Sequence, residues 1–348
     1  MRDFQRMEKF RIGLYGCGKR SQKLLQTSLA NGTACVTCCH DIDRSRAELL
    51  AKQYGARACS LDELLTAKDV DMYLISLFPA AHPDALFAAV QTNKPVYIEK
   101  PVAVFMPEIC RVRELCGKHY INVGLFYQYM PIYRQLTHLV KSGMLGDLVA
   151  MNFNWLQYRP ELRKSVDEKN PDWRYVPQTG GELTQHYCHC FEWFRLLNGP
   201  IEQLYAMSNQ HSSNATCVED IWDLLLKHRN GCQISFHSSE CNPRCTVYGS
   251  IEGSEGALSW EYNDPSTIIY HKNAPPHTPG VPVEINIPTP DAIEDFIDRW
   301  RKGLPPAVSL EEGLWAVIPP LYARKSAREG RLVELPQTLA ELSPNEDI

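Results

Sequence analysis

The stretch Phe10–Ser21, FRIGLYGCGKRS, contains the motif from which the fold can be predicted. An apolar run ends at Tyr15, Gly16 and Gly18 follow one residue apart, and a helical pattern with Ser21 at its start comes next. Such a turn places backbone N–H groups at a helix N-terminus, where a dinucleotide pyrophosphate binds. An ordinary strand-to-helix turn is the alternative, because glycine serves any turn that needs positive φ.

The residues after this turn repeat the same alternation of strand and helix. Short apolar runs at 34–41, 71–78 and 95–100 read as buried strands, and helical patterns separate them. Ser60 to Glu63, SLDE, is a capping-box pattern that predicts the start of a further helix. The order βαβαβ requires crossover connections, so it predicts a doubly wound parallel sheet with helices on its faces.

From about residue 148 the pattern changes to longer strand-like stretches. Asn230-Gly231 lies between two of them and predicts a hairpin with a type I′ turn. Two helical patterns close the chain, at 291–303 and 309–330, each ended by glycine. We therefore predict an α/β chain with two domains, residues 1–127 around a parallel sheet and residues 128–348 around a mostly antiparallel sheet.

Composition excludes several classes of function. The chain has 348 residues and a formal net charge of -5, with both signs interspersed, so a nucleic-acid-binding surface is not expected. It begins without a signal-peptide pattern and contains no run of about 20 apolar residues, so we expect a soluble, cytoplasmic protein without membrane contact. Thirteen cysteines, an odd number, are expected to be reduced thiols.

Asp41 ends the second predicted strand, 23 residues after Gly18. A carboxylate at this point accepts hydrogen bonds from both ribose hydroxyls of NAD and repels the 2′-phosphate of NADP. Asp41 therefore favours NAD, with NADP as the weaker alternative because Arg44 lies nearby. Asp43 is expected to be solvated.

Two further stretches contain candidates for chemistry. IEKP places Glu99 and Lys100 at the carboxyl end of a strand, where doubly wound folds bind ligands. If residues 182–197 form one helix, Glu182, Gln185 and His189 make a polar stripe beside an apolar face. A structural histidine is the alternative for His189, and a surface lysine for Lys100.

A metal site is not expected in the segment HYCHC, residues 186–190. Its histidines and cysteines include consecutive residues, and consecutive residues of a helix point in different directions.

These motifs together resemble one enzyme family. The Gly-x-Gly turn, Asp41, FPAAH ending at His82, EKP, KSGMLGDLVAMNFNW and GGELTQHYCH are similar, in order and spacing, to those of glucose-fructose oxidoreductases, inositol dehydrogenases and related sugar dehydrogenases. The resemblance implies an amino-terminal Rossmann domain and a carboxyl-terminal substrate-binding domain. The large open antiparallel sheet of that second domain would serve as the interface of a homodimer or homotetramer.

The resemblance also implies roles for individual residues. Lys100 matches the lysine that hydrogen-bonds the reacting hydroxyl, His189 matches the catalytic acid/base, and Gln185 stands where many members have aspartate. Gln128 replaces a common arginine, and Leu77-Phe78 replace threonine and proline. The expected cofactor contacts are Gly16, Gly18, Lys19, Arg20, Asp41, Arg44, Phe78, His82, Glu99 and Lys100. The expected substrate contacts are Tyr127, Arg159, Trp173, Arg174 and Gln185.

The function expected from these residues is hydride transfer between NAD(P) and a secondary hydroxyl of a sugar, cyclitol or sugar derivative. His189 would exchange the proton, because histidine titrates near neutral pH. Tyr187 and His186 are rivals for this role if the helix begins differently. Two alternative functions retain the motifs: redox-neutral processing of a glycoside with tightly held NAD, and a non-catalytic regulator that senses a ligand.

Overall fold

The computed structural model describes residues 8–158, 179–211, 218–263, 265–273, 275 and 277–348. The predicted substrate contacts Arg159, Trp173 and Arg174 lie outside the described residues. The chain divides into two compact units. The first comprises Met1–Ala103, Glu108–Phe126 and Pro290–Leu314, and the second comprises Val104–Pro107, Tyr127–Thr289 and Trp315–Ile348.

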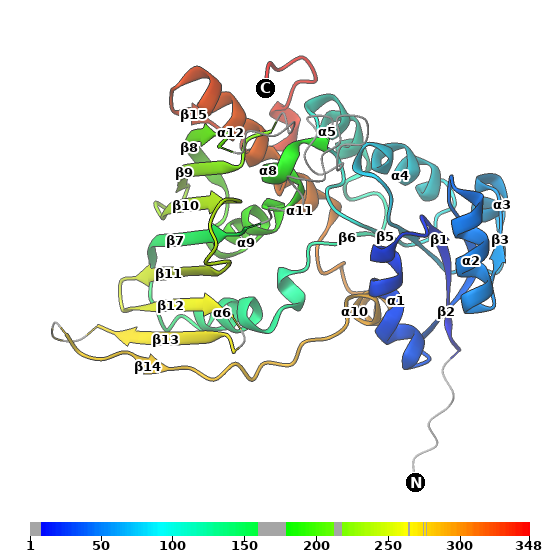
Figure 1. The fold of residues 1–348 in the computed structure, drawn as a ribbon, viewed down its shortest axis with the longest axis horizontal. Helices are drawn as coiled ribbons and strands as arrows, with labels where there is room; N and C mark the ends of the chain where they lie inside the picture. Colours follow the sequence, from blue (N-terminus) through cyan, green and yellow to red (C-terminus); the bar gives the residue numbers. More distant parts are fainter. Residues whose placement is uncertain (1–7, 159–178, 212–217, 264, 274, 276) are drawn as a thin grey trace, which may run out of the picture. The chain divides into compact units, whose positions relative to one another are not determined.

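The first unit contains a parallel sheet of six described strands in the order β3-β2-β1-β4-β5-β6 (Figure 1). This is the strand order of a dinucleotide-binding doubly wound fold, and it confirms the predicted fold class. The strands are β1 Phe10–Tyr15, β2 Ala34–His40, β3 Arg57–Ala58, β4 Met72–Ile75, β5 Val96–Ile98 and β6 Ile121–Val123. The helices include α1 Lys19–Ala30, α2 Arg44–Tyr54, α3 Leu61–Thr66, α4 His82–Val90 and α5 Met106–Val112.

Helix α10, Ala292–Arg301, also belongs to the first unit although it lies far along the sequence. Its Phe296 is fully buried and packs edge-on against Tyr97, with 5.8 Å between ring centroids. Thr33 Oγ1 donates a hydrogen bond of 2.6 Å to Glu294 on the same helix. The segment 290–314 therefore completes the core of the first unit, outside the single range 1–127 expected for that domain.

Local signals in the sequence fix several helix ends. Ser60 and Glu63 form the predicted capping box at the start of α3. Gly55 ends α2 in the left-handed conformation, with φ 66°, as expected for a C-terminal glycine. The pattern at 309–330 is two helices rather than one, α11 Leu310–Trp315 and α12 Ile318–Glu329. Pro319 and Pro320 lack an N–H group, so they fit only the first turn of a new helix.

The second unit contains a mixed sheet of nine described strands in the order β14-β13-β12-β11-β7-β10-β9-β8-β15. All pairs are antiparallel except β7 with β10, which agrees with the predicted, mostly antiparallel sheet. The strands are β7 Leu148–Leu156, β8 Ile201–Asn209, β9 Ile221–His228, β10 Gln233–Ser239, β11 Val247–Gly253, β12 Gly256–Tyr262, β13 Thr267–Lys272, β14 Val281–Pro282 and β15 Val333–Glu334.

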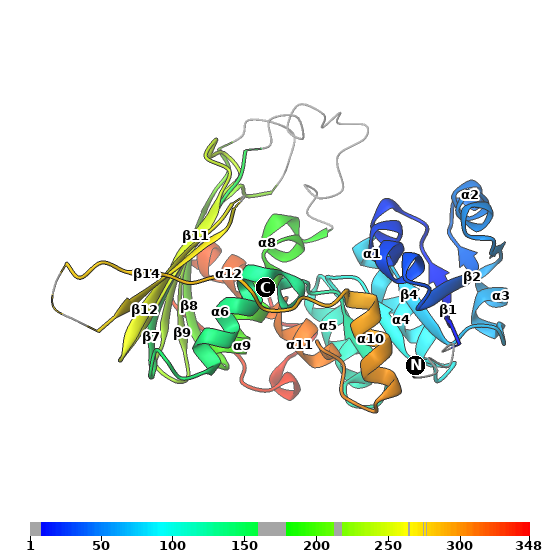
Figure 2. The ribbon, with the colours of Figure 1, turned by 90° about the horizontal axis from the view of Figure 1, so that it is seen from below.

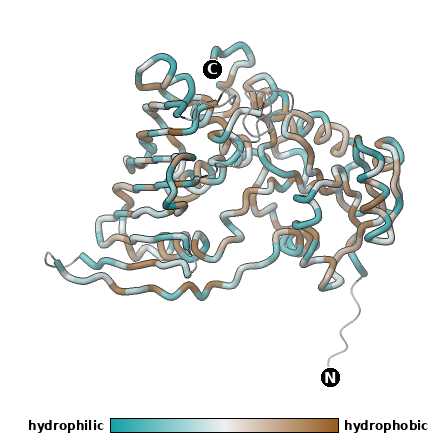
Figure 3. The backbone as a smooth tube through the Cα atoms, in the orientation of Figure 1, coloured by the Kyte–Doolittle hydropathy of each residue, from teal (hydrophilic) through white to brown (hydrophobic). Residues whose placement is uncertain are grey.

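Helices cover one face of this sheet (Figure 2). They are α6 Pro131–Lys141, α8 Gly181–Gln185, α9 Cys188–Asn198 and α12. Phe153 of β7 is fully buried and contacts Phe194 of α9 edge-on, with 5.3 Å between ring centroids. Along β9 buried and exposed residues alternate. Figure 3 shows hydrophobic and hydrophilic segments alternating along strands of this sheet.

The opposite face of the sheet is polar at its centre. Ser235, Asn152, Ser250 and Ser259 stand opposite one another across β10, β7, β11 and β12. An uncovered sheet face that forms an oligomer interface would be expected to carry an apolar patch, and this expectation is wrong at the centre of the face. Exposed apolar side chains occur nearer the β8 edge, at Leu225 and Met207. Period-2 patterning specifies which residues share a face, but serine and asparagine also fit a sheet whose one side is uncovered.

The Asn230-Gly231 hairpin joins β9 and β10, but its turn differs from the predicted type I′. Of these two residues only Gly231 has positive φ, 91°, whereas a type I′ turn needs positive φ at both. Gly231 N donates to His228 O at 2.9 Å, and His228 N donates to Cys232 O at 2.9 Å. The loop thus has three residues, with glycine at the left-handed position that follows a type I turn.

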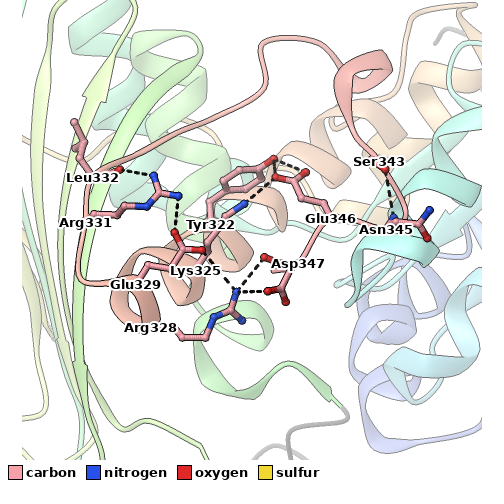
Figure 4. A network of polar contacts seen from close by, with 10 residues as sticks. All are labelled: Tyr322, Lys325, Arg328, Glu329, Arg331, Leu332, Ser343, Asn345, Glu346 and Asp347. Carbon is pink, nitrogen blue, oxygen red and sulfur yellow. Dashed lines mark hydrogen bonds and ion pairs between the residues drawn. The ribbon is translucent and has the colours of Figure 1, made fainter.

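The C-terminal residues bind back to α12 (Figure 4). Tyr322 Oη and Lys325 Nζ lie 2.8 and 3.3 Å from Glu346 Oε1, and Arg328 Nη2 lies 3.5 Å from Asp347 Oδ2. Arg331, just after the helix, forms an ion pair with Glu329 at 2.6 Å. These contacts hold the C-terminal residues against α12.

Candidate cofactor and active site

The turn after β1 needs glycine at its first position. Gly16 has φ 99°, and a Cβ atom there would overlap the carbonyl oxygen of Ser76. Its N–H donates to His40 O at 2.8 Å, which joins the turn to the end of β2. Only glycine lets the chain pass this close to β4 in this conformation.

Gly18 plays a different part. It has an ordinary φ of -76°, caps the N-terminus of α1 without a side-chain bond, and an added Cβ would meet nothing within 4 Å. Ser21, fully buried, donates to Gly18 O at 2.8 Å. Its small side chain thus fits the third position of the dinucleotide-binding motif G-x-G-x-x-G, where helix and sheet pack closely. The first turn of α1 has no acidic residue, and Lys19 is exposed there. Open space beside an uncapped helix N-terminus fits a bound pyrophosphate.

Asp41 braces this turn through its carboxylate. Oδ2 accepts from Cys17 N at 2.8 Å, and Oδ1 accepts from Asp43 N at 2.9 Å. Asp43 is not simply solvated, since it caps α2 by accepting from Ser45 N at 3.1 Å. Arg44 is exposed and pairs with Glu48 at 3.0 Å.

Glu99 and Lys100 follow β5 as predicted. Glu99 is 5% exposed and accepts from Arg20 Nε at 2.9 Å. Arg20, an expected cofactor contact, is therefore anchored by a carboxylate, with its guanidinium also over the Phe126 ring. Lys100 is half-buried, and its peptide bond to Pro101 is cis.

His82 lies in the interior of the first unit. Its ring is fully buried, Nδ1 donates to Pro101 O at 2.6 Å, and Nε2 accepts from Leu77 N at 3.3 Å. Burial lowers the pKa of His82 to about 4, so the ring is neutral near pH 7. His82 thus ties the turn after β4 to the loop that holds Lys100, whereas Phe78 beside it is 44% exposed.

The predicted helix 182–197 is broken into α8 and α9 at His186 and Tyr187. Tyr187 N–H donates to Glu182 O, five residues back, at 3.3 Å. This π-type bond inserts an extra residue into the turn, so Gln185 and His189 do not continue one stripe. A single inserted residue changes the hydrophobic periodicity very little. The break between α8 and α9 could therefore not be predicted from the sequence.

His189, in the first turn of α9, packs against aromatic rings. It is fully buried, and its ring stacks on Tyr127 with 5.5 Å between centroids. Tyr127, an expected substrate contact, is itself 1% exposed, stacks on Tyr133 at 3.8 Å, and has its hydroxyl 3.4 Å from Cys190 Sγ. Burial raises the pKa of Tyr127 well above its usual range. Tyr127 therefore packs against the His189 ring within the core, and its role as a substrate contact stays a prediction.

His186 forms a pair with a buried carboxylate. Its Nδ1 lies 3.0 Å from Glu182 Oε2, and the two side chains are 25% and 2% exposed. The Trp155 ring packs against His186 with 4.9 Å between centroids. This pair was not expected, although the i,i+4 spacing of Glu182 and His186 in the sequence was a usable signal.

The backbone at the start of α8 is held by a distant helix. Gly180 and Gly181 have φ 77° and 56°, and a Cβ on Gly180 would meet Val104 at 2.7 Å. Arg324 of α12 donates to Gly180 O and, at 3.0 Å, to Thr184 Oγ1. Gln185 Nε2 donates to Thr179 O. Sequence reasoning missed Arg324, because nothing local links it to a turn 144 residues away.

Within the described residues, no group of histidine, cysteine, aspartate or glutamate side chains could hold a metal ion. No described helix is long and apolar enough to cross a membrane.

Comparison with known proteins identifies both parts of the chain. Residues 10–126 match the model of an oxidoreductase family with an NAD-binding Rossmann fold, and residues 133–259 match the GFO/IDH/MocA C-terminal domain. Inositol 2-dehydrogenase of Salmonella typhimurium is 25% identical over 94% of this chain and 97% of its own. The enzyme of the same name from Rhizobium meliloti is 22% identical over 93% and 99%.

Solved structures share the fold. Levoglucosan dehydrogenase in complex with NADH and L-sorbose has a TM-score of 0.82 at 17% identity, covering 95% of this chain and all of that one. Aldose-aldose oxidoreductase from Caulobacter crescentus has a TM-score of 0.80 at 19% identity, covering 94% of this chain and 100% of that one.

The two glycines of the turn should respond differently to alanine. Gly16→Ala should lower the melting temperature, because the added methyl overlaps Ser76. Gly18→Ala should leave the melting temperature nearly unchanged and weaken NADH binding about tenfold or more, because its methyl occupies the space for a pyrophosphate. Thermal denaturation and a titration of NADH fluorescence measure both effects. Unchanged NADH affinity in Gly18→Ala would contradict the proposed position of the cofactor.

Proposed function

This chain belongs to the GFO/IDH/MocA family of oxidoreductases, and from that premise we propose that it transfers a hydride between a nicotinamide and a secondary hydroxyl of a sugar, cyclitol or sugar derivative. The glycine turn at α1 is the observation that carries the proposal, since it has the conformation and the open space that a dinucleotide needs. The match to inositol 2-dehydrogenases along both units supports it.

The proposed chemistry divides between the cofactor and the chain. A bound nicotinamide dinucleotide supplies the hydride acceptor or donor. His189 takes the proton of the reacting hydroxyl in the oxidation and returns it in the reduction. Lys100 donates a hydrogen bond to the same hydroxyl and polarises it. Gln185 orients its neighbours without exchanging protons, because an amide does not titrate near neutral pH.

His186 is the second candidate for proton exchange. A carboxylate on one ring nitrogen fixes the tautomer and leaves the other nitrogen as the proton acceptor. The bond from His186 to Glu182, together with its greater exposure than His189, favours this role. The two histidines make different predictions, so mutation separates them.

A cavity of the second unit suits a polyol. It has a volume of about 410 Å³, and Trp155 and Tyr262 contribute aromatic surface while Gln157, Thr246 and Asn263 contribute polar groups. Aromatic faces pack on the C–H face of a sugar, and amide and hydroxyl groups bind its hydroxyls. Trp155 joins this cavity to the His186 ring. Arg159, Trp173 and Arg174 stay predictions as further substrate contacts.

His189→Ala should lower turnover roughly 100- to 10,000-fold, the usual range for general acid–base catalysis, with NADH affinity nearly unchanged. His186→Ala is the matched variant, because it removes an imidazole three residues away. Steady-state kinetics and NADH titrations test both. Near-normal turnover in His189→Ala with loss in His186→Ala would transfer proton exchange to the Glu182–His186 pair.

The same assay separates the alternative functions. Product formation without net NADH would indicate redox-neutral processing of a glycoside, and ligand binding without turnover would indicate a regulator.

NAD should bind more tightly than NADP, because the carboxylate of Asp41 lies at the end of β2 and repels a 2′-phosphate. Asp41→Ala should reduce the difference in binding affinity between NAD and NADP. Loss of the Cys17 N–H bond also weakens the turn, so affinity for NAD falls in the same variant. Paired titrations of wild type and Asp41→Ala measure both constants, and tighter binding of NADP by wild type would refute the role of Asp41.

We also propose that the chain forms a homodimer or homotetramer through the uncovered face of the second sheet. Light scattering at micromolar concentration should give two or four times 39.7 kDa. Ser250→Arg places a charge at the centre of that face and should shift the mass towards the monomer, whereas Ser343→Arg, near the C-terminus, should not. A monomeric wild type would contradict the proposal.

A further inference from the structure

We propose that a cavity between α6 and α9 binds the anionic group of a small phosphorylated or carboxylated molecule. The cavity has a volume of about 220 Å³ and belongs entirely to the second unit. Its walls are formed by Gln128, Arg134, Thr137, His138, Lys141, Trp193, Leu196 and Ile287. This inference goes beyond the proposed hydride transfer and does not depend on it.

The basic side chains of the cavity come from one face of a single helix. Arg134, His138 and Lys141 are spaced by four and three residues along α6, so their side chains project on the same side. No acidic residue is among the residues that form the walls. A small anion entering this space therefore meets the positive charges of Arg134 and Lys141 on the α6 wall.

Arg134 is the strongest indication of an anion site, because no carboxylate pairs with its charge within the described part of the chain. Its Nη1 donates to Gln128 O at 2.9 Å, while its Nε is buried and has no hydrogen-bond partner. No ion pair joins Arg134 to a carboxylate of any described residue, whereas Arg244 and Arg331 of the same unit each have one. A guanidinium stays charged, so a partly buried one without a counter-ion favours an anionic ligand.

The position of Arg134 in α6 excludes a simple helix-dipole explanation. His138 and Lys141 lie in the last turn, where a cation is stabilised without any ligand. Arg134 lies only three residues after Pro131, near the positive end of the helix, where a cation is unfavourable. The helix dipole therefore does not account for a cation at this position.

The other residues that line the cavity indicate the chemistry of the uncharged part of the ligand. Trp193 is 1% exposed, and its Nε1 donates to Thr137 Oγ1 at 2.9 Å, so indole and hydroxyl are both satisfied by the protein. Leu196 and Ile287 add apolar surface. Gln128 Nε2 donates to Glu192 Oε1 at 2.9 Å, so this buried carboxylate binds a wall residue other than Arg134. A small organic body with one phosphate or carboxylate fits these walls better than a bare inorganic ion.

The test is isothermal titration of the full chain with glycerol phosphate, succinate, inorganic phosphate and uncharged glycerol, in a non-anionic buffer at low salt. Each titration is repeated with saturating NADH, because an anion at the N-terminus of α1 would be displaced by the cofactor and one at α6 would not. We expect saturable binding of glycerol phosphate or succinate that persists with NADH, and none of glycerol. Comparing the titrations with glycerol phosphate and with succinate shows whether the site prefers a phosphate or a carboxylate.

Variants connect the binding to the cavity. Arg134→Gln should weaken it about tenfold, the loss of one charge-assisted contact, and Arg134→Lys should recover part of it. Lys141→Gln should weaken it less. Lys52→Gln, in the last turn of α2, is the matched control and should have no effect.

Three outcomes would overturn the proposal: no saturable binding of any anion, loss of all anion binding with NADH, or equal anion affinity in wild type and in a second variant, Lys141→Glu, which reverses the charge. The Lys141 variant keeps the test valid even if Arg134→Gln fails to fold. None of these results depends on turnover, so the failure of this site and the failure of the proposed hydride transfer are distinguishable.

Discussion

The close approach of the Gly16 backbone to the Ser76 carbonyl determines the position of the turn at the carboxyl ends of the parallel strands in the first unit. Gly16 N binds His40 O at 2.8 Å, and Ser76 N binds Tyr15 O at 2.9 Å, so the ends of β2, β1 and β4 are joined at one level. This junction fixes where α1 begins, and therefore where its unbonded N–H groups lie. A side chain at position 16 would separate β1 from β4 and move the whole turn.

In the second unit the corresponding constraint acts over a long sequence distance. Arg324 bonds to Gly180 O and Thr184 Oγ1, so α12 holds the first turn of α8. From there the π-type interruption passes the chain into α9, whose His189 rests on the Tyr127–Tyr133 stack. Aromatic rings are stiff and bury large areas, so this layer limits the rotation of His189. The site thus depends on packing in the second unit as much as on its own residues.

The sequence predicts what is decided locally and misses what is decided by distant contacts. The Ser60 cap, the Gly55 terminus and the βαβ order follow from short-range chemistry, and all are present. The division at Pro319-Pro320 was readable too, because proline cannot continue a helix. The parallel pairing of β7 with β10, and the return of α10 to the first unit, have no local signal. Both features depend on tertiary packing, because an amphipathic helix or strand packs against the core whose surface is complementary to its apolar face.

Gln185, which stands where the resemblance to sugar dehydrogenases implies an aspartate, lies among buried carboxylates in this chain. Three carboxylates are already buried nearby in the second unit, and each has a hydrogen-bond partner: Glu182 with His186, Glu192 with Gln128 and Glu240 with Tyr187. A carboxylate at position 185, which is 3% exposed, would add a further charge one turn from Glu182. Burying like charges together raises the cost of ionising each, whereas an amide keeps the hydrogen bond to Thr179 O without charge. The hydrogen bonds of this segment therefore favour a neutral amide at position 185 over a further carboxylate.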